Sequence, residues 1–77
     1  MAPKVWLYKK SLSTIRIVQR ESGTASELLV FGPAGERRDE RFASTVQALN
    51  FQRLLQRQIL GRGFTLAWTS GDDAPAL

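Results

Sequence analysis

The chain has 77 residues, of which 43% are hydrophobic and 9% aromatic, so it forms one small globular domain with no room for a second core. It contains neither cysteine nor histidine, which excludes disulfide bridges, thiol or imidazole catalysis and the usual ligands of zinc. Eleven Lys and Arg residues against seven Asp and Glu give a net charge of +4, which is typical of proteins that bind polyanions or acidic partners, and equally of proteins that charge merely keeps soluble.

No apolar run approaches the roughly 20 residues that are needed to cross a bilayer. The first residues, Met-Ala-Pro-Lys, lack the long apolar stretch of a secretory signal. We therefore expect a cytoplasmic protein without a membrane partner.

The first 31 residues predict three β-strands. Each is a short run of aliphatic, β-branched or aromatic residues, and turn-forming residues separate one run from the next. The third run is apolar on both faces, which is typical of an interior strand. The three runs cover residues 4–9, 14–20 and 27–31.

A turn and a charged strand follow. Residues 32–35, Gly-Pro-Ala-Gly, favour a hairpin turn, because proline presets one corner and glycine tolerates positive φ. They lack the spacing of a phosphate-binding loop. Residues 36–42 are almost all charged, which is typical of a solvated edge strand, and Phe42 is expected to anchor the end of this strand to the core.

Residues 44–60 predict an α-helix. Ser44 is placed to cap its first turn, and Gln47 stands three residues later, at the spacing of a capping box. Gly61 follows at a position that favours a left-handed cap. The core side of the helix is predicted to be the apolar stripe Ala48, Phe51, Leu55 and Ile59.

The end of the chain predicts a short last strand or an extended arm over residues 64–69. Strict alternation would place Phe64, Leu66 and Trp68 on one face. Residues 70–77 are small and polar and predict a flexible tail. Without the two aspartates of that tail, eleven basic residues remain against five acidic ones, which gives the folded body a charge of +6.

These elements predict an α+β domain over residues 1–69. Closely spaced strands pair antiparallel, so we expect a sheet of about four strands with one helix packed across one face, in the order β-β-β-β-α and then the short strand or arm. The other face of the sheet is expected to stay uncovered.

Four arginines are the candidates for a binding surface on that uncovered face. Alternation places Arg16 and Arg20 on one face of their strand and the isoleucines of that strand on the other face. Arg37 and Arg41 project from the side opposite Phe42. The four guanidinium groups are therefore predicted to share one face of the sheet.

Trp6 or Tyr8 joins this surface if the register of the first strand brings it to the same face. Arginines beside aromatic rings form a platform for phosphates and stacked bases. The alternative is that both rings belong to the core and that the arginines only solvate a strand face.

The helix carries a second partly apolar side, which a helix on a single sheet does not need. This side suggests a homodimer or a contact with another protein, and packing of the last segment with Trp68 against the helix is an equally good explanation. Its residues are Val46, Leu49, Arg53, Arg57 and Leu60.

Several short motifs in the second half of the chain match the pattern of a known module. They are Phe31-Gly32-Pro33-Ala34-Gly35, Phe42-Ala43-Ser44, Ala48 and Gly61-Arg62-Gly63-Phe64. Over these residues the chain resembles a WGR domain, which occurs in DNA-damage-dependent poly(ADP-ribose) polymerases and in stand-alone bacterial proteins. Phe31 stands in place of the signature tryptophan and Pro33 in place of the signature arginine. The resemblance implies a sheet with one helix and, because several such domains bind DNA ends, a nucleic-acid partner.

The sequence therefore predicts a small, basic, non-enzymatic module that binds DNA or RNA through the arginine-bearing face. The alternative is a protein-interaction or dimerisation module that acts through the helix. No cofactor, metal or small-molecule substrate is expected. The candidate carboxylates, Asp39 and Glu40, lie among arginines that pair with them, and no useful pocket is expected under a single helix.

Overall fold

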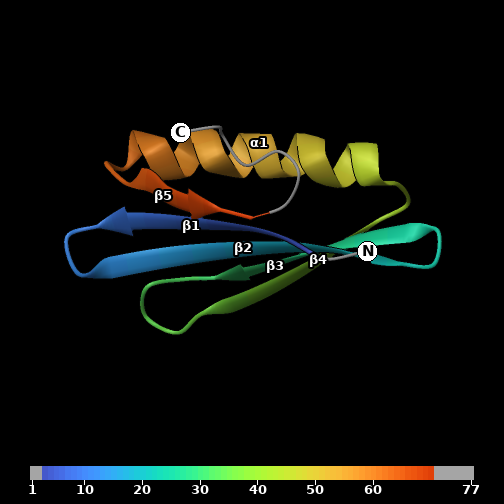
Figure 1. Ribbon diagram of the computed structural model, residues 1–77, viewed down its shortest axis with the longest axis horizontal. Coiled ribbons are helices and arrows are strands. Elements are labelled where there is room, and N and C mark those ends of the chain that lie inside the picture. Colours follow the sequence, from blue (N-terminus) through green and yellow to red (C-terminus); the bar gives the residue numbers. More distant parts are fainter. Residues whose placement is uncertain (1–2, 71–77) are drawn as a thin grey trace.

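Five antiparallel strands form one sheet, and a single helix crosses one of its faces (Figure 1). The computed structural model describes residues 3–70 of the chain. The predicted α+β fold is confirmed, with five strands rather than about four, because the last segment pairs with the first strand. The order across the sheet is β4-β3-β2-β1-β5. In chain order the elements are β1 (Lys4–Lys10), β2 (Ser13–Ser22), β3 (Ala25–Phe31), β4 (Arg37–Phe42), α1 (Thr45–Gly61) and β5 (Thr65–Thr69).

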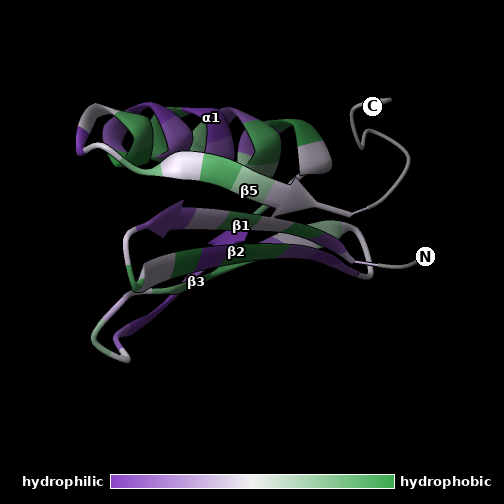
Figure 2. Cartoon of the chain, turned by 60° about the vertical axis from the view of Figure 1, so that its left-hand side comes forward, coloured by the Kyte–Doolittle hydropathy of each residue, from purple (hydrophilic) through white to green (hydrophobic). Residues whose placement is uncertain are grey.

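The register of the strands assigns the side chains to two faces. On the face beneath α1, Trp6 stands opposite Ile17, and Ile17 stands opposite Val30. Figure 2 shows the helix as a second layer along the strands, with hydrophobic and hydrophilic residues alternating along the elements. The buried core between the two layers consists of Tyr8, Ile15, Ile17, Leu28, Ala48, Ile59 and Phe64.

The two edges of the sheet differ in character. Strand β4, Arg-Arg-Asp-Glu-Arg-Phe, pairs with β3 on one side and carries charges along most of its length, as predicted for an edge. Strand β5, Thr-Leu-Ala-Trp-Thr, forms the other edge and carries no charge. Only one edge is therefore protected from further strand pairing by charged residues.

Helix α1 begins where the sequence predicts. The Gln47 amide, in the first turn, donates to Ser44 Oγ over 3.3 Å. The amide of Ala43, the residue before the cap, donates to Gln47 Oε1 over 3.2 Å. Phe42, at the end of β4, packs against Phe51 with ring centres 5.2 Å apart. This contact joins the end of the charged strand to the core, as expected.

The end of the helix differs from the prediction. Gly61 is the last helical residue, and the left-handed conformation occurs two residues later, at Gly63 with φ +96°. Between them, the Arg62 amide donates to the Gln58 and Ile59 carbonyls over 3.2 and 3.1 Å. One further residue of helix is thus tolerated because a second glycine is available to reverse the chain.

Strand β5 contains an irregularity that the sequence does not reveal. Leu66 stands opposite Tyr8, whereas Trp68 stands opposite Leu7, and the register shifts between these two pairs. Ala67 is the extra residue of a β-bulge, which reverses the alternation of the strand. The prediction of a common face for Leu66 and Trp68 is therefore wrong: Leu66 lies on the helix side and Trp68 on the opposite side.

Pairing at this edge extends to Ser70. The Val5 amide donates to Ser70 Oγ and the Ser70 amide donates to the Val5 carbonyl, both over 2.9 Å. Ser70, which the sequence predicts to belong to the flexible tail, is thus hydrogen-bonded to β1. The rest of that predicted tail, residues 71–77 with Asp72 and Asp73, lies outside the described residues.

Candidate functional site

The face of the sheet that α1 leaves uncovered carries the four arginines predicted to share a surface. We call it the open face and define it as the side that bears Leu7, Arg16 and Phe31. Arg16 and Arg37 flank Phe31 in one row of paired residues, and a second row contains Arg20, Glu27 and Arg41. The alternation predicted for β2 and β4 brings these guanidinium groups to one face. Strand β3 pairs with both strands, and residues that pair directly across strands point to the same side of the sheet.

Most of the charge on this face is positive. The strand residues of this face include five cations, the four arginines and Lys9, and two carboxylates, those of Glu27 and Asp39. Arg20 Nε lies 3.7 Å from Glu27, and Arg37 Nε lies 3.0 Å from Asp39. Within the described part of the chain, Arg16 and Arg41 form no ion pair, although Arg41 stands opposite Glu27, which pairs with Arg20.

Phe31 orders two of the arginines. The guanidinium carbon of Arg16 lies 4.5 Å from the centre of the Phe31 ring, and that of Arg37 lies 5.9 Å from it. The cation–π contact holds the Arg16 guanidinium group in place while its N–H groups stay accessible. Arg37 in addition donates from Nε and Nη2 to the two carboxylate oxygens of Asp39, over 3.0 and 3.3 Å. The hydrogen bond and the charge of Asp39 raise the pKa of Arg37, so Arg37 stays charged at every physiological pH.

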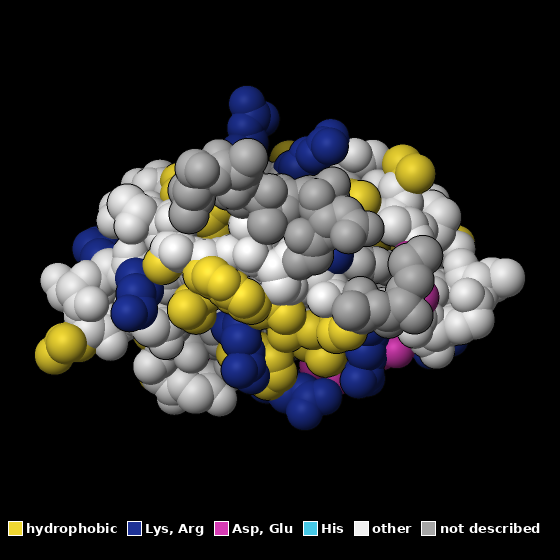
Figure 3. Space-filling view, in the orientation of Figure 1, with side chains coloured by type: hydrophobic (Ala, Val, Ile, Leu, Met, Phe, Trp, Pro, Cys, Tyr) yellow, Lys and Arg dark blue, Asp and Glu magenta, His cyan; other side chains and the backbone are white. Residues whose placement is uncertain are grey.

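A partly apolar floor lies among these charges. Leu7 stands opposite Arg16, and Val18 stands opposite Leu29, which is 7% exposed even though no helix covers it. Trp68, on the neighbouring edge strand, is 54% exposed. Figure 3 shows hydrophobic side chains gathered over the strands, with Lys and Arg side chains beside and between them. This mixture of apolar and cationic groups suits a ligand that has both anionic and flat apolar parts.

The structure places Trp6 and Tyr8 on the helix side of the sheet, so neither lies beside the arginines. Tyr8 is fully buried, and Trp6 packs against the core. Tyr8 Oη donates to Gln56 Oε1 over 2.6 Å and accepts from Gln52 Nε2 over 2.9 Å. Burial raises the pKa of Tyr8 to about 12, against a smaller lowering by the hydrogen bond from Gln52. Both rings therefore belong to the helix side of the sheet, as in the alternative interpretation of the sequence, and Leu7 between them faces the arginines.

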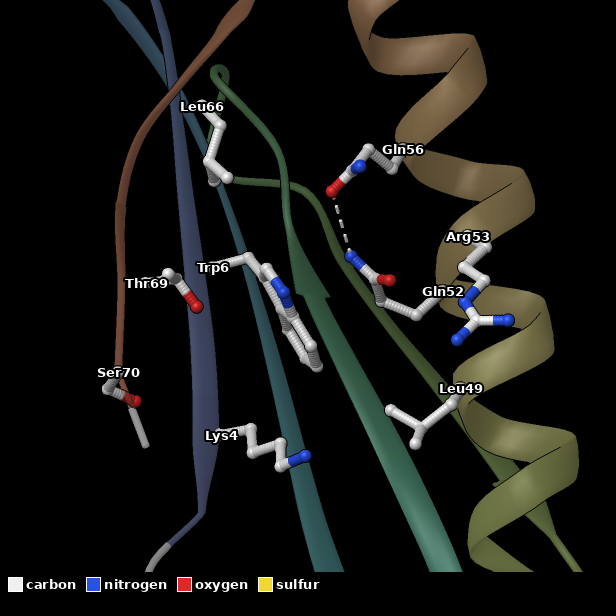
Figure 4. A pocket seen from close by; sticks show the side chains of 9 residues that line it. All are labelled: Lys4, Trp6, Leu49, Gln52, Arg53, Gln56, Leu66, Thr69 and Ser70. Carbon is white, nitrogen blue, oxygen red and sulfur yellow. Dashed lines mark hydrogen bonds between the residues drawn. The ribbon is translucent and has the colours of Figure 1, made fainter. Parts of the chain in front are cut away.

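The second side of the helix faces β1 and β5 across a groove (Figure 4). Leu49, Gln52 and Arg53 approach Trp6 and Leu66 there, and the volume between them is ≈ 270 Å³. The five residues predicted as a contact surface differ in exposure: Val46 is 67% and Leu60 43% exposed, Leu49 is half-buried, and Arg53 and Arg57 are exposed.

The alternative explanation for this helix side, packing of Trp68 against it, does not hold. Trp68 lies on the open face, and Leu66 is the β5 residue that reaches the groove. Val46 and Leu60 thus remain exposed on the helix.

Hollows flank the helix on both sides, although no useful pocket was expected. The second one, of ≈ 300 Å³, lies over β3 and β4 and is lined by Val30, Leu55, Arg38 and Arg62 among others. No group of acidic residues suited to a metal ion occurs among residues 3–70. The helix of this same stretch is also too short and too polar to span a membrane.

The turn between β3 and β4 is a hairpin turn, as the sequence predicts. Gly35 has φ +86°, and the Gly32 amide donates to the Glu36 carbonyl over 2.8 Å. The Ala34 amide donates to Glu36 Oε1 over 2.7 Å. A carboxylate of the chain itself therefore occupies the amide that a bound phosphate would need.

Sequence reasoning missed two aromatic residues of the open face, Phe31 and Trp68. Phe31 ends an apolar run, so the sequence does not indicate which of its faces is buried. Trp68 is displaced by the bulge at Ala67, which no residue type in the strand signals. A comparison with protein-family models, curated proteins and solved structures finds no match for this chain.

Proposed function

We propose that this chain is a nucleic-acid-binding module that holds a sugar–phosphate backbone on its open face. The observation that carries the proposal is the convergence of Arg16, Arg20, Arg37 and Arg41 on one side of the sheet, with no element of residues 3–70 covering them. Guanidinium groups bind phosphate oxygens through two parallel hydrogen bonds, and several such contacts make binding strong at low salt.

Two further features support the proposal. The cations of the open face outnumber its carboxylates, and two of them, Arg16 and Arg41, need not give up an ion pair on binding. Phe31 holds Arg16 and Arg37 in place, which reduces the side-chain entropy lost when a ligand is bound. The resemblance to WGR domains points to the same class of ligand.

The test compares two double variants that remove the same charge from different places. Arg16→Gln/Arg41→Gln alters the open face, whereas Arg53→Gln/Arg57→Gln alters the exposed side of the helix. Fluorescence anisotropy with labelled DNA and RNA oligomers, over a series of salt concentrations, gives the affinity and its salt dependence.

We expect the open-face variant to bind more weakly. Its negative slope of log K against log salt should be shallower by about 1.4–1.8, because two phosphate contacts are lost. The helix variant should keep the wild-type slope. Absence of binding to any oligomer at low salt, or equal losses in both variants, would contradict the proposal.

A second candidate is a protein contact, a homodimer or a different partner, through the helix side and the β5 edge. It is favoured by two separate features, the exposure of Val46 and Leu60 on the helix and the absence of charge along β5. Light scattering of the wild type against Leu49→Glu tests self-association, since a charge beside the groove would dissociate a dimer formed there. A monomer in both cases removes the homodimer.

A further inference from the structure

We propose that the nucleic acid bound is single-stranded and that Trp68 is the residue on which one of its bases stacks. The inference rests on the function proposed above and adds to it a ligand class and a contact residue. It starts from the two aromatic rings of the open face. The Phe31 ring is already in contact with Arg16 and Arg37, whereas Trp68 is 54% exposed.

Trp68 lies in line with the arginines. One row of directly paired residues crosses all five strands of the sheet. From β5 to β4 it consists of Trp68, Leu7, Arg16, Phe31 and Arg37. Neighbouring strands are about 4.8 Å apart, so this row places Arg16 about 10 Å and Arg37 about 19 Å from Trp68 along the sheet. An extended strand laid along the row has phosphates at the guanidinium groups and a base over the indole ring.

The indole ring distinguishes single strands from duplexes. In a duplex, the faces of the bases are covered by their neighbours, and the backbone offers no flat surface to an exposed ring. In a single strand every base has an accessible face, and stacking on an aromatic side chain is tolerant of sequence. The helix, which is the shape that fits a major groove, lies on the opposite side of the sheet from the four arginines of the open face.

The experiment uses probes that differ only in their bases. They are a short labelled thymidine oligomer, an oligomer of the same length that lacks bases, and a duplex of the same length. The proteins are the wild type, Trp68→Ala, Trp68→Phe and, as a control on the helix side of the sheet, Trp6→Phe. Circular dichroism spectra verify that each variant is folded.

We expect Trp68→Ala to bind the thymidine oligomer about 5- to 150-fold more weakly, the range that alanine substitutions at stacking aromatics span. Trp68→Phe should recover most of this loss, because it retains a ring. Binding to the base-free oligomer and to the duplex should be unchanged in all variants. In Trp6→Phe, where Trp68 is the remaining tryptophan, the fluorescence should be quenched by the thymidine oligomer.

The outcomes separate the inference from the function on which it rests. If Trp68→Ala leaves binding of the thymidine oligomer unchanged, or weakens all three probes equally, stacking on Trp68 is wrong. In either case the arginine variants still decide whether the open face binds nucleic acid. If the wild type binds none of the probes at low salt, both proposals fail together.

Discussion

The guanidinium carbon of Arg16 lies over the Phe31 ring of the neighbouring strand, 4.5 Å from its centre. The two residues form the last pair of the β2–β3 ladder on the open face, and Phe31 is the residue at which β3 ends. The ring gives the long, flexible side chain of Arg16 one preferred position. Unlike a carboxylate, it does not neutralise the charge of the guanidinium group. The two residues therefore act as a pair, in which Phe31 positions the group that we propose to contact phosphate.

This pairing predicts that Phe31→Leu weakens nucleic-acid binding without changing its salt dependence. The substitution keeps an apolar side chain at the position but removes a cation–π contact worth about 0.5–1 kcal/mol at an exposed site. We expect a loss of about 2- to 5-fold in affinity with an unchanged slope of log K against log salt, measured by fluorescence anisotropy. A lower slope would mean that Phe31→Leu removes a phosphate contact outright, which contradicts a positioning role.

The buried hydrogen bonds of Tyr8 predict a stability effect that depends on the partner. In Tyr8→Phe, the Gln52 amide loses its better acceptor at a site where the side chain is 4% exposed. Leaving a buried polar group without its partner costs about 1–3 kcal/mol, and we expect a decrease of this order in the free energy of unfolding, measured by urea titration.

The double variant Tyr8→Phe/Gln52→Leu supplies the control. Because it removes both partners and keeps the volume, it should be less destabilised than the sum of the two single variants. Additive losses would show that the Tyr8–Gln52 hydrogen bond contributes little to stability.

The same tyrosine predicts a pH dependence at the alkaline end. Burial raises the pKa of Tyr8 from 10.0 to about 12, so between these values the unfolded chain loses the phenol proton while the folded chain keeps it. The contribution of Tyr8 to stability is therefore complete below pH 10 and is lost as the pH rises towards 12. Urea titrations across this range should show a steeper decline for the wild type than for Tyr8→Phe, and parallel curves would contradict the assignment.

The two glycines after the helix predict opposite effects of alanine. Gly63 has φ +96°, and a Cβ atom there would lie 3.3 Å from the Lys10 side chain, so Gly63→Ala should destabilise the fold by about 1 kcal/mol or more. Gly61 is helical and has open space around it, so Gly61→Ala should stabilise by about 0.5–1 kcal/mol. Thermal unfolding of both variants measures the contrast. Equal effects would place the left-handed residue elsewhere.

Patterns that repeat within one element were sufficient to predict much of this fold. The alternation of Ile15 and Ile17 with Arg16 and Arg20 predicts which side of β2 is buried, since both isoleucines lie on one face and both arginines on the other. In the same way Ser44 and the stripe from Ala48 to Ile59 predict the start and the core side of the helix. The grouping of the four arginines follows from this local periodicity.

Where both sides of a strand are apolar, the sequence is ambiguous and only tertiary structure decides. In β1, Trp6 and Tyr8 alternate with Val5 and Leu7, and either pair is a plausible core; pairing with β2 places the aromatic pair under the helix. In β5, the bulge at Ala67 turns Trp68 to the open face, away from Leu66. Period-two alternation specifies that neighbouring side chains oppose each other, but which of them faces the core depends on register, and register is set by contacts between residues far apart in the chain.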